Sequence, residues 1–225
     1  MRFGLRDDTI GIVQHAFGLT IPESLDEVCD PQRTALIIYD MQAGIVPQLP
    51  DGQEIAARVV QVRQLARDAG LRVFYTRHMS LPNELSGVSQ LRTAMAWQRL
   101  TRVDDVKPRF LRGSPAFEIT PELTPSASEA IFDKLAMSAF VGTPLDMALR
   151  DCNINSFLIV GIALEVGIEP TVRHAIDLGY IAILVTDACG SRDKPAADRA
   201  LAQLAFAGGS LQTDIDTLST VLRRR

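Results

Sequence analysis

Two charged residues lie at the ends of otherwise apolar segments. Asp40 follows the run Thr34–Tyr39, and Lys134 closes the shorter run 130–134. A carboxylate in such a place is partly desolvated, so the pKa of Asp40 should rise unless a cation, for which Lys134 is the candidate, lies beside it. A half-buried Asp and Lys can donate and accept protons on a bound substrate. A structural ion pair, or an Asp that caps the next helix, accounts for the two residues equally well.

The segment 161–171, Gly-Ile-Ala-Leu-Glu-Val-Gly-Ile-Glu-Pro-Thr, has the pattern of a strand that enters a turn and then a helix. Free backbone N–H groups at such a helix start can hold an oxyanion or a carboxylate. Taken alone, the segment is equally typical of an ordinary strand-to-helix turn in which glycine provides tightness.

The elements that position these residues follow from the hydrophobic pattern. Short apolar runs rich in β-branched residues alternate with segments of helical period. The predicted strands are 34–40, 71–76, 130–134, 156–161, 181–187 and 209–213. Near-continuous apolar strands separated by amphipathic helices indicate a parallel sheet covered on both faces. We therefore predict an α/β fold, a doubly wound Rossmann-like sandwich with a six-stranded, mostly parallel sheet and helices on both faces.

A sheet of this kind binds its ligands at the carboxyl ends of its strands. Asp40, the pair Arg77 and His78, Lys134 and the turn 161–167 are all expected at that edge. The fold therefore predicts one rim that carries the candidate residues.

Two segments do not follow the alternation of strands and helices. Residues 1–33 contain the apolar stretch Ile10–Ile21, and we interpret them as an N-terminal arm that lies on its own domain or on a neighbouring subunit. Residues 34–225 form the domain, with an insertion at 79–128 that contains the only tryptophan, Trp97. Because a long connection in a compact domain is usually functional, we expect this insertion to form a pocket wall or a lid.

Composition excludes several classes of protein. A chain of 225 residues suits one compact domain, and a net charge of -4 with interspersed signs predicts no nucleic-acid partner. The apolar runs are too short to span a membrane and the first residues lack a signal-peptide pattern, so we predict a cytoplasmic protein without a membrane partner. The three cysteines form no CxxC pair and the three histidines are isolated, so we expect no metal, no other cofactor and no disulfide framework.

From about residue 34 to about residue 213, the chain resembles the isochorismatase-like hydrolases, also called the cysteine hydrolase superfamily. The first matching motifs are Ala-Leu-Ile-Ile-Tyr-Asp-Met-Gln at 35–42 and Asp-Lys-Leu-Ala-Met-Ser-Ala-Phe-Val-Gly-Thr-Pro-Leu at 133–145. The others are Ile-Val-Gly-Ile-Ala-Leu-Glu-Val-Gly-Ile-Glu-Pro-Thr at 159–171 and Val-Thr-Asp-Ala-Cys-Gly-Ser at 185–191. Each motif is weak alone, whereas their joint order and spacing are specific.

The resemblance implies a catalytic triad of Asp, Lys and Cys. It assigns Asp40 and Lys134 to the first two roles and position 167 to the third, where this chain has Gly167. Glycine excludes acyl-enzyme chemistry through a thiolate at that position. Cys189, in the motif after the next strand, is not expected to replace it and is interpreted as an inert packing residue.

True isochorismatases resemble this chain in having glycine at the same place. They hydrolyse the vinyl ether of isochorismate to pyruvate and a dihydroxycyclohexadiene carboxylate without a protein nucleophile. The resemblance therefore implies that Asp40 is the general acid, that Lys134 is its electrostatic partner, and that Gly167 leaves room for substrate or water. It also implies backbone donors from the turn around Ala163 and Gly167, with a cis peptide bond before Ala163.

Further substrate contacts are expected from residues on the same rim and from the insertion. The candidate substrate-binding residues are Gln42, Arg77, His78, Trp97 and Ala163. Arg77 could bind a substrate carboxylate with two parallel hydrogen bonds, although surface exposure is the commoner fate of an arginine. His78 could contact the substrate or cap its own loop.

Three functions fit these features. The first is a cysteine-independent hydrolase of a small anionic metabolite, for which isochorismate is the best named substrate. The second is an amidase in which Asp40 acts as base and water attacks directly. The third is a binding or assembly protein that lost its nucleophile. The expected partners are a small-molecule substrate and, as is common in the family, further copies of the chain in a homodimer or higher homo-oligomer.

Overall fold

A parallel sheet forms the centre of the computed structural model, which describes residues 14–224. Among these residues, six strands pair side by side in the order β5-β4-β3-β6-β7-β8, every pair parallel. They are β3 (Thr34–Tyr39), β4 (Arg72–His78), β5 (Ala130–Lys134), β6 (Ser156–Ile162), β7 (Ile181–Gly190) and β8 (Ser210–Thr213). The chain winds outward from β3 to one edge and then crosses back to β6, which confirms the predicted doubly wound sheet.

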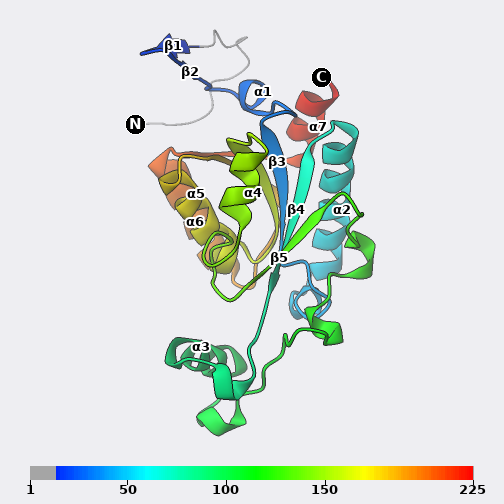
Figure 1. Cartoon of the computed structure of the whole chain (residues 1–225), viewed down its shortest axis with the longest axis vertical. Coiled ribbons are helices and arrows are strands. Elements are labelled where there is room, and N and C mark those ends of the chain that lie inside the picture. Colours follow the sequence, from blue (N-terminus) through cyan, green and yellow to red (C-terminus); the bar gives the residue numbers. More distant parts are fainter. Residues whose placement is uncertain (1–13, 225) are drawn as a thin grey trace.

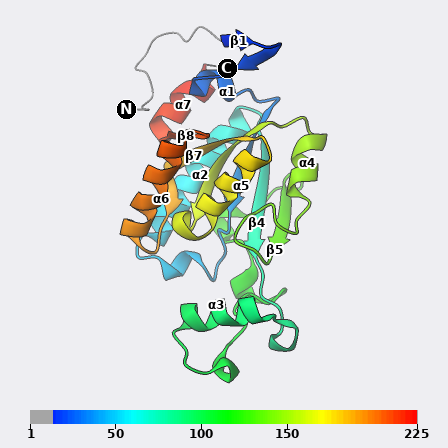
Figure 2. The ribbon, with the colours of Figure 1, turned by 90° about the vertical axis from the view of Figure 1, so that its left-hand side faces the viewer.

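Helices cover both faces of this sheet (Figures 1 and 2). One face carries α2 (Gly52–Asp68) and α7 (Ile215–Arg223). The other carries α4 (Leu145–Asp151), α5 (Glu169–Asp177) and α6 (Lys194–Ala207). Side chains alternate along the central strand, so that Leu36 and Ile38 face α2 whereas Ile37 and Tyr39 face α5.

Three strands extend further at their carboxyl ends than the apolar pattern predicted. β4 continues through Arg77 and His78, β6 through Ile162, and β7 to Gly190. The extension of β4 pairs Arg77 with Asp133 and His78 with Lys134 in the parallel register with β5. The prediction for β4 stopped before Arg77 and His78 because these residues are polar. The pairing continues through them because backbone hydrogen bonds between strands do not depend on side-chain polarity.

The first described residues form a small hairpin of β1 (Gln14–Ala16) and β2 (Leu19–Ile21), at the end of the molecule opposite the carboxyl edge of the sheet (Figure 1). Its turn residue Phe17 is fully exposed. Of the predicted apolar stretch Ile10–Ile21, residues 10–13 lie outside the described residues. After the hairpin, α1 (Leu25–Val28) leads into the domain, where Val28 and Cys29 are buried.

The insertion at 79–128 divides into two parts. Residues 83–105 contain short 3-10 helices at Asn83–Leu85 and Val103–Asp105 and the helix α3 (Val88–Gln98), which projects beyond the carboxyl ends of the strands (Figures 1 and 2). The second part has 3-10 turns at Pro115–Phe117 and Pro121–Leu123 and returns to the body, where Phe117 and Leu123 are fully buried. The projecting part is held by polar contacts, including a side-chain amide of Gln98 that donates to the backbone oxygen of Lys107 at 2.9 Å.

The end of β6 requires glycine at position 161. Gly161 has φ +121°, and a Cβ built on it would lie 2.1 Å from the backbone oxygen of Tyr39 on the neighbouring strand. The peptide bond between Ile162 and Ala163, just after the strand, is cis, as expected from the family resemblance. No helix among the described residues is long and apolar enough to cross a membrane.

We predict that Gly161→Ala destabilises the protein more than an alanine at another glycine with positive φ. Gly70 is the matched control because it has φ +76° with no atom within 4 Å of a built Cβ. Urea unfolding should show a loss of about 1–2 kcal/mol for Gly70→Ala and about 3–5 kcal/mol for Gly161→Ala, since backbone contact adds to the strain. Equal losses would show that the close approach of β3 and β6 is not a constraint.

Candidate active site

Asp40 lies where β3 ends, and its backbone has φ +48°, a strained conformation for a non-glycine residue. The residue is 4% exposed, and both carboxylate oxygens have donors. Thr76 Oγ1, from β4, donates to Oδ1 at 2.6 Å, and Lys134 Nζ, from β5, donates to Oδ2 at 2.7 Å. Three adjacent strands therefore position one carboxylate, and the structure brings together the two charged residues that the sequence singled out.

The ammonium group of Lys134 is almost completely shielded from water, with 1% of the side chain exposed. It also donates to the backbone oxygen of Ala136 at 3.2 Å and lies 4.3 Å from the centre of the Tyr39 ring. Burial lowers the pKa of Lys134, and the charge and hydrogen bond of Asp40 oppose this shift. A proton shared by such a pair can be delivered to a substrate or taken from it.

Tyr39 occupies the place that a side chain at position 167 would take, so the absence of a side chain there does not by itself leave room for substrate or water. A Cβ built on Gly167 would lie 2.1 Å from Oη and 2.4 Å from Cζ of Tyr39. The Tyr39 ring fills this space because residue 39 points to the α5 face of the sheet. Its hydroxyl donates a hydrogen bond to the backbone oxygen of Met137, and the residue is 2% exposed.

In the turn after β6, the N–H group of Gly167 is not the free donor that was expected. A π-helical turn at Leu164–Ile168 precedes α5. Within it the N–H groups of Val166, Gly167 and Ile168 donate to the backbone oxygen of Ala163 at 3.3, 2.9 and 3.2 Å. These three donors are therefore used inside the turn and do not form an oxyanion hole. Ala163 itself lines the cavity described next.

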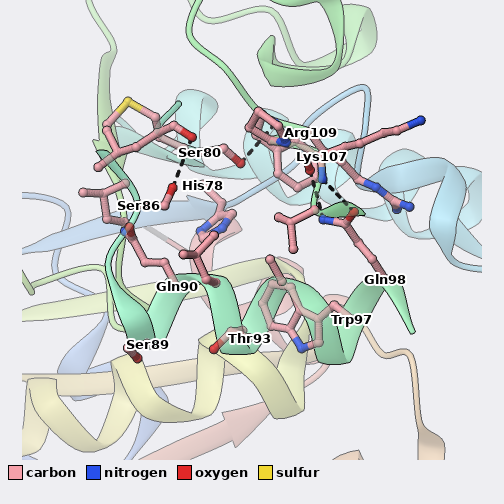
Figure 3. A pocket seen from close by; sticks show the side chains of 18 of the residues that line it. His78, Ser80, Ser86, Ser89, Gln90, Thr93, Trp97, Gln98, Lys107 and Arg109 are labelled. Carbon is pink, nitrogen blue, oxygen red and sulfur yellow. Dashed lines mark hydrogen bonds between the residues drawn. The ribbon is translucent and has the colours of Figure 1, made fainter. Parts of the chain in front are cut away.

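Two adjoining cavities lead from the surface to Asp40. The inner one, of about 80 Å³, is lined by residues that include Asp40, Lys134, Ala163 and Gly167. The outer one, of about 350 Å³, lies between α3 and the segment 106–110. Figure 3 shows the outer cavity, with Ser89, Thr93 and Trp97 on α3 and with Lys107 and Arg109 across from it. The prediction that the insertion forms a pocket wall is confirmed for its first part.

His78 lies where the two cavities meet, between the rings of Trp97 and Phe110. Its ring centre is 5.8 Å from that of Phe110 in an edge-on arrangement and 6.2 Å from that of Trp97. Burial and the charge of Lys134 lower the pKa of His78 to about 4, although Asp40 acts in the opposite direction. His78 is therefore a neutral part of the cavity wall at neutral pH, and Trp97 lines both cavities beside it.

Two other predicted substrate contacts, Gln42 and Arg77, are not among the residues that line the cavities. Gln42 is fully buried, where its side-chain amide donates to the backbone oxygens of His78 and Phe117 and accepts from the His78 N–H. Arg77 forms ion pairs with Asp133 and Glu118, each at 2.9 Å. Adjacent residues of a strand point to opposite faces, so His78 faces the cavity and Arg77 faces away from it.

The sequence reasoning did not identify several residues that shape the site. Tyr39 and Thr76 surround the Asp40–Lys134 pair, and their positions at the ends of β3 and β4 were the available signal. Three cationic side chains, Lys107, Arg109 and Arg192, line the outer cavity, and none of them forms an ion pair in the described part of the chain. They are scattered in the sequence and meet only in the fold.

Other groups that could bind a metal or act as a nucleophile lie apart from the site. Among residues 14–224, no cluster of three or more His, Cys, Asp or Glu side chains is arranged to hold a metal ion. Burial raises the pKa of the Cys189 thiol to about 12, with a smaller contribution from the charge of Asp187. Cys189 is therefore protonated at neutral pH and is not an activated nucleophile.

Comparison with known proteins places these features in context. A family model described as the isochorismatase domain matches residues 34–216. The isochorismatase family protein YwoC of Bacillus subtilis (strain 168) is 31% identical over 161 residues, which cover 71% of this chain and 78% of YwoC. The ureidoacrylate amidohydrolase RutB of Acinetobacter baylyi is 26% identical over 175 residues, 71% of each chain. A solved structure of a cysteine hydrolase from Pseudomonas syringae pv. phaseolicola shares the fold, with a TM-score of 0.75 at 23% identity, covering 88% of this chain and 95% of that one.

We predict that the neutral His78 makes the protein sensitive to acid. Its pKa is about 4 in the folded chain against 6.5 ordinarily, so between these values the unfolded state binds the proton and stability falls as the pH falls. The full shift corresponds to about 3 kcal/mol. Thermal unfolding of His78→Phe from pH 7 to pH 4 should show a correspondingly smaller loss than the unsubstituted protein. The control is His15→Phe in the exposed hairpin; parallel curves for all three proteins would contradict a buried neutral His78.

Proposed function

This chain belongs to the isochorismatase family of hydrolases, and from that premise we propose that it is a cysteine-independent hydrolase of a small anionic metabolite. The reaction that we propose is hydrolysis of the vinyl ether of isochorismate to pyruvate and a dihydroxycyclohexadiene carboxylate. Asp40 is the general acid in this proposal, and Lys134 is its electrostatic partner.

The observation that carries the proposal is a buried acid–base pair at the end of a cavity with no nucleophile beside it. Asp40 and Lys134 line the inner cavity, and their side chains are in contact at 2.7 Å. The third position expected from the family, 167, has no side chain, and the Tyr39 ring fills the space beside it. A reaction that needs proton transfer but no covalent enzyme intermediate fits this arrangement.

The steps of the proposed reaction use the pair as a proton source. Asp40, protonated in the substrate complex, transfers its proton to the methylene carbon of the enolpyruvyl group, and the ether carbon becomes an oxygen-stabilised cation. Water adds to that carbon to give a hemiketal. The bond from this carbon to the ether oxygen then breaks as the hemiketal hydroxyl becomes the pyruvate carbonyl, and its proton passes to the departing oxygen, which leaves as the alcohol. The proton of the attacking water returns to Asp40, so one water is consumed and the pair ends as it began. Lys134, at 2.7 Å, stabilises the carboxylate while it lacks the proton.

The walls of the cavity support an anionic substrate with an apolar body. His78, Trp97 and Phe110 offer aromatic surface where the inner and outer cavities meet. Lys107, Arg109 and Arg192 bring three positive charges to the outer cavity without carboxylate partners among the described residues. Charge-assisted hydrogen bonds from such groups bind carboxylates more strongly than neutral donors do.

A second candidate is amide hydrolysis with Asp40 as base and direct attack of water. The observation in its favour is the similarity to a protein named as a ureidoacrylate amidohydrolase. Such an enzyme would release ammonia from amides or carbamoyl compounds and no pyruvate from isochorismate. A binding or assembly protein would do neither, which makes the two product assays sufficient to separate the three functions.

We predict that Asp40→Asn lowers pyruvate release from isochorismate by about 10³-fold, because general acid catalysis contributes on this scale. Release is followed through a coupled lactate dehydrogenase reaction. The variant also leaves Lys134 without its carboxylate, which should destabilise the fold by about 3–5 kcal/mol. The double variant Asp40→Asn/Lys134→Met removes the unpaired charge, so it should recover stability in thermal unfolding without recovering activity.

Two results would contradict this assignment. Undiminished turnover by folded Asp40→Asn would exclude Asp40 as the acid. Recovery of activity along with stability in the double variant would show that Asp40 only supports the fold. If the unsubstituted protein releases ammonia from amides and no pyruvate from isochorismate, the amidase function replaces the one proposed.

We also predict that Arg192→Gln raises the KM for an anionic substrate about tenfold while kcat changes little. Arg192 lines both cavities, and a charge-assisted hydrogen bond to the substrate is worth about 1.5–3 kcal/mol. Steady-state kinetics at low ionic strength measure the effect. Arg199→Gln, an exposed position on α6, is the matched control. The same KM in both variants would remove Arg192 from substrate recognition.

A further inference from the structure

The ring of Tyr39 lies between two features of the site that have no obvious connection in the sequence. The edge of the ring that carries the hydroxyl meets the backbone of Gly167, where a built Cβ would lie 2.1–2.5 Å from Oη, Cζ and Cε1. The ammonium group of Lys134 lies over the face of the same ring, 4.3 Å from its centre. Any side chain at position 167 would therefore displace the group that faces Lys134.

The ring is fixed in this place. It is 2% exposed, its hydroxyl donates to the backbone oxygen of Met137, and it belongs to the core on the α5 side of the sheet. Burial raises the pKa of Tyr39 well above its usual value, and the charge of Asp40 adds to the shift. The phenol is therefore neutral at neutral pH, and it contributes a ring face and a hydrogen-bond donor.

Lys134 has few sources of stabilisation for a buried charge. Asp40 accepts one hydrogen bond at 2.7 Å and the backbone oxygen of Ala136 accepts another at 3.2 Å. The remaining charged or titratable groups that face it are His78, which is neutral at neutral pH, and Tyr39. An aromatic face close to a desolvated ammonium ion is attracted to it by the ring quadrupole.

We propose that Tyr39 is a positioning residue whose ring, seated against the bare backbone of Gly167, keeps Lys134 protonated and in contact with Asp40. The structural role of Tyr39 does not depend on the proposed function. Its consequence for catalysis, that Lys134 stays charged beside the acid Asp40, does rest on that function. The role of Gly167 is then to make room for the Tyr39 ring.

The test measures the charge of Lys134 directly and does not require activity. The chain contains three lysines, Lys107, Lys134 and Lys194, so a protein labelled with 13C at the lysine Cε gives few signals, and Lys134→Met identifies the one of interest. The pH midpoint of that signal reports when Lys134 loses its proton. Tyr39→3,4,5-trifluorophenylalanine weakens the attraction of the ring face for a cation with a small increase in ring size. It is compared with Tyr39→Phe, which keeps an ordinary ring and lacks only the hydroxyl.

The midpoint should fall by about 0.5–1.5 pH units from Tyr39→Phe to the trifluorinated variant, as expected from the strength of a desolvated cation–π contact. Gly167→Ala should also lower the midpoint, because the new methyl group pushes the Tyr39 ring away from Lys134. Tyr180→Leu is the matched control, because the ring of Tyr180 faces Arg150 at 5.1 Å far from the pair, and the Lys134 midpoint should not move.

An unchanged midpoint in the trifluorinated variant would overturn the proposal, as would a Gly167→Ala protein with the midpoint and thermal stability of the original. Thermal unfolding shows that the fluorinated variant is folded before its midpoint is compared, so the test does not depend on the folding of Gly167→Ala. A shifted midpoint together with no hydrolysis of isochorismate would support the role of Tyr39 and reject the proposed function, which keeps the two failures distinct. Where the protein is active, the alkaline limb of kcat/KM should move to lower pH with the midpoint, a change that lost packing alone would not produce.

Discussion

The buried contact between Asp40 and Lys134 determines which groups must surround it in the site. Removing two charges from water carries a penalty of several kcal/mol for each ion, and their attraction offsets it only when the remaining hydrogen-bonding positions are also filled. Here the Thr76 hydroxyl donates a hydrogen bond to the second carboxylate oxygen. The ammonium group donates to the backbone oxygen of Ala136 and contacts the face of the Tyr39 ring. The parallel register of β3, β4 and β5 makes this possible, because it brings the ends of three strands to one place. A shift of one residue in any of these strands would turn its polar side chain to the other face of the sheet.

The same constraint explains why two glycines stand at the end of β6 and in the turn after it. Gly161 lets the backbone of β6 approach β3 closely, and Gly167 lets the side chain of Tyr39 occupy the space under the turn. Three amides of the turn, those of Val166, Gly167 and Ile168, donate to the backbone oxygen of Ala163. Both glycines therefore act through what lies next to them. In the second case the neighbour is the ring that faces Lys134, so a residue with no side chain influences the electrostatics of the site.

The sequence predicted the fold well because it depends on local pattern, and it predicted the central pair because each of the two residues comes at the end of a predicted strand. Apolar runs of β-branched residues marked the strands, and the family resemblance, which the family model confirms over residues 34–216, linked Asp40 to Lys134. The relations that it missed are between residues far apart in the chain. Nothing in the sequence indicated that Tyr39 fills the space beside Gly167, because strand alternation predicts a direction for residue 39 but not what it meets there. Arg77 and His78 were both candidates, and only the phase of β4 decided that His78 faces the cavity and Arg77 pairs with Asp133.

The inner cavity contains the Asp40–Lys134 pair, and the residues that line the outer cavity include three cations. In the proposed function the inner cavity supplies an acid–base pair and no cysteine at position 167, so protonation of the substrate generates the electrophile. An enol ether meets this requirement, since protonation of its carbon yields a cation that water attacks without activation. An amide does not, because its carbonyl is a poor electrophile and water would need both a base and an oxyanion hole, whereas three amides of the turn are already bonded to Ala163. The positive charges of Lys107, Arg109 and Arg192 fit the same substrate, since an enolpyruvyl compound carries a carboxylate next to the bond that breaks. Proton donation at one end and anion recognition at the other together favour vinyl-ether hydrolysis over direct amide hydrolysis.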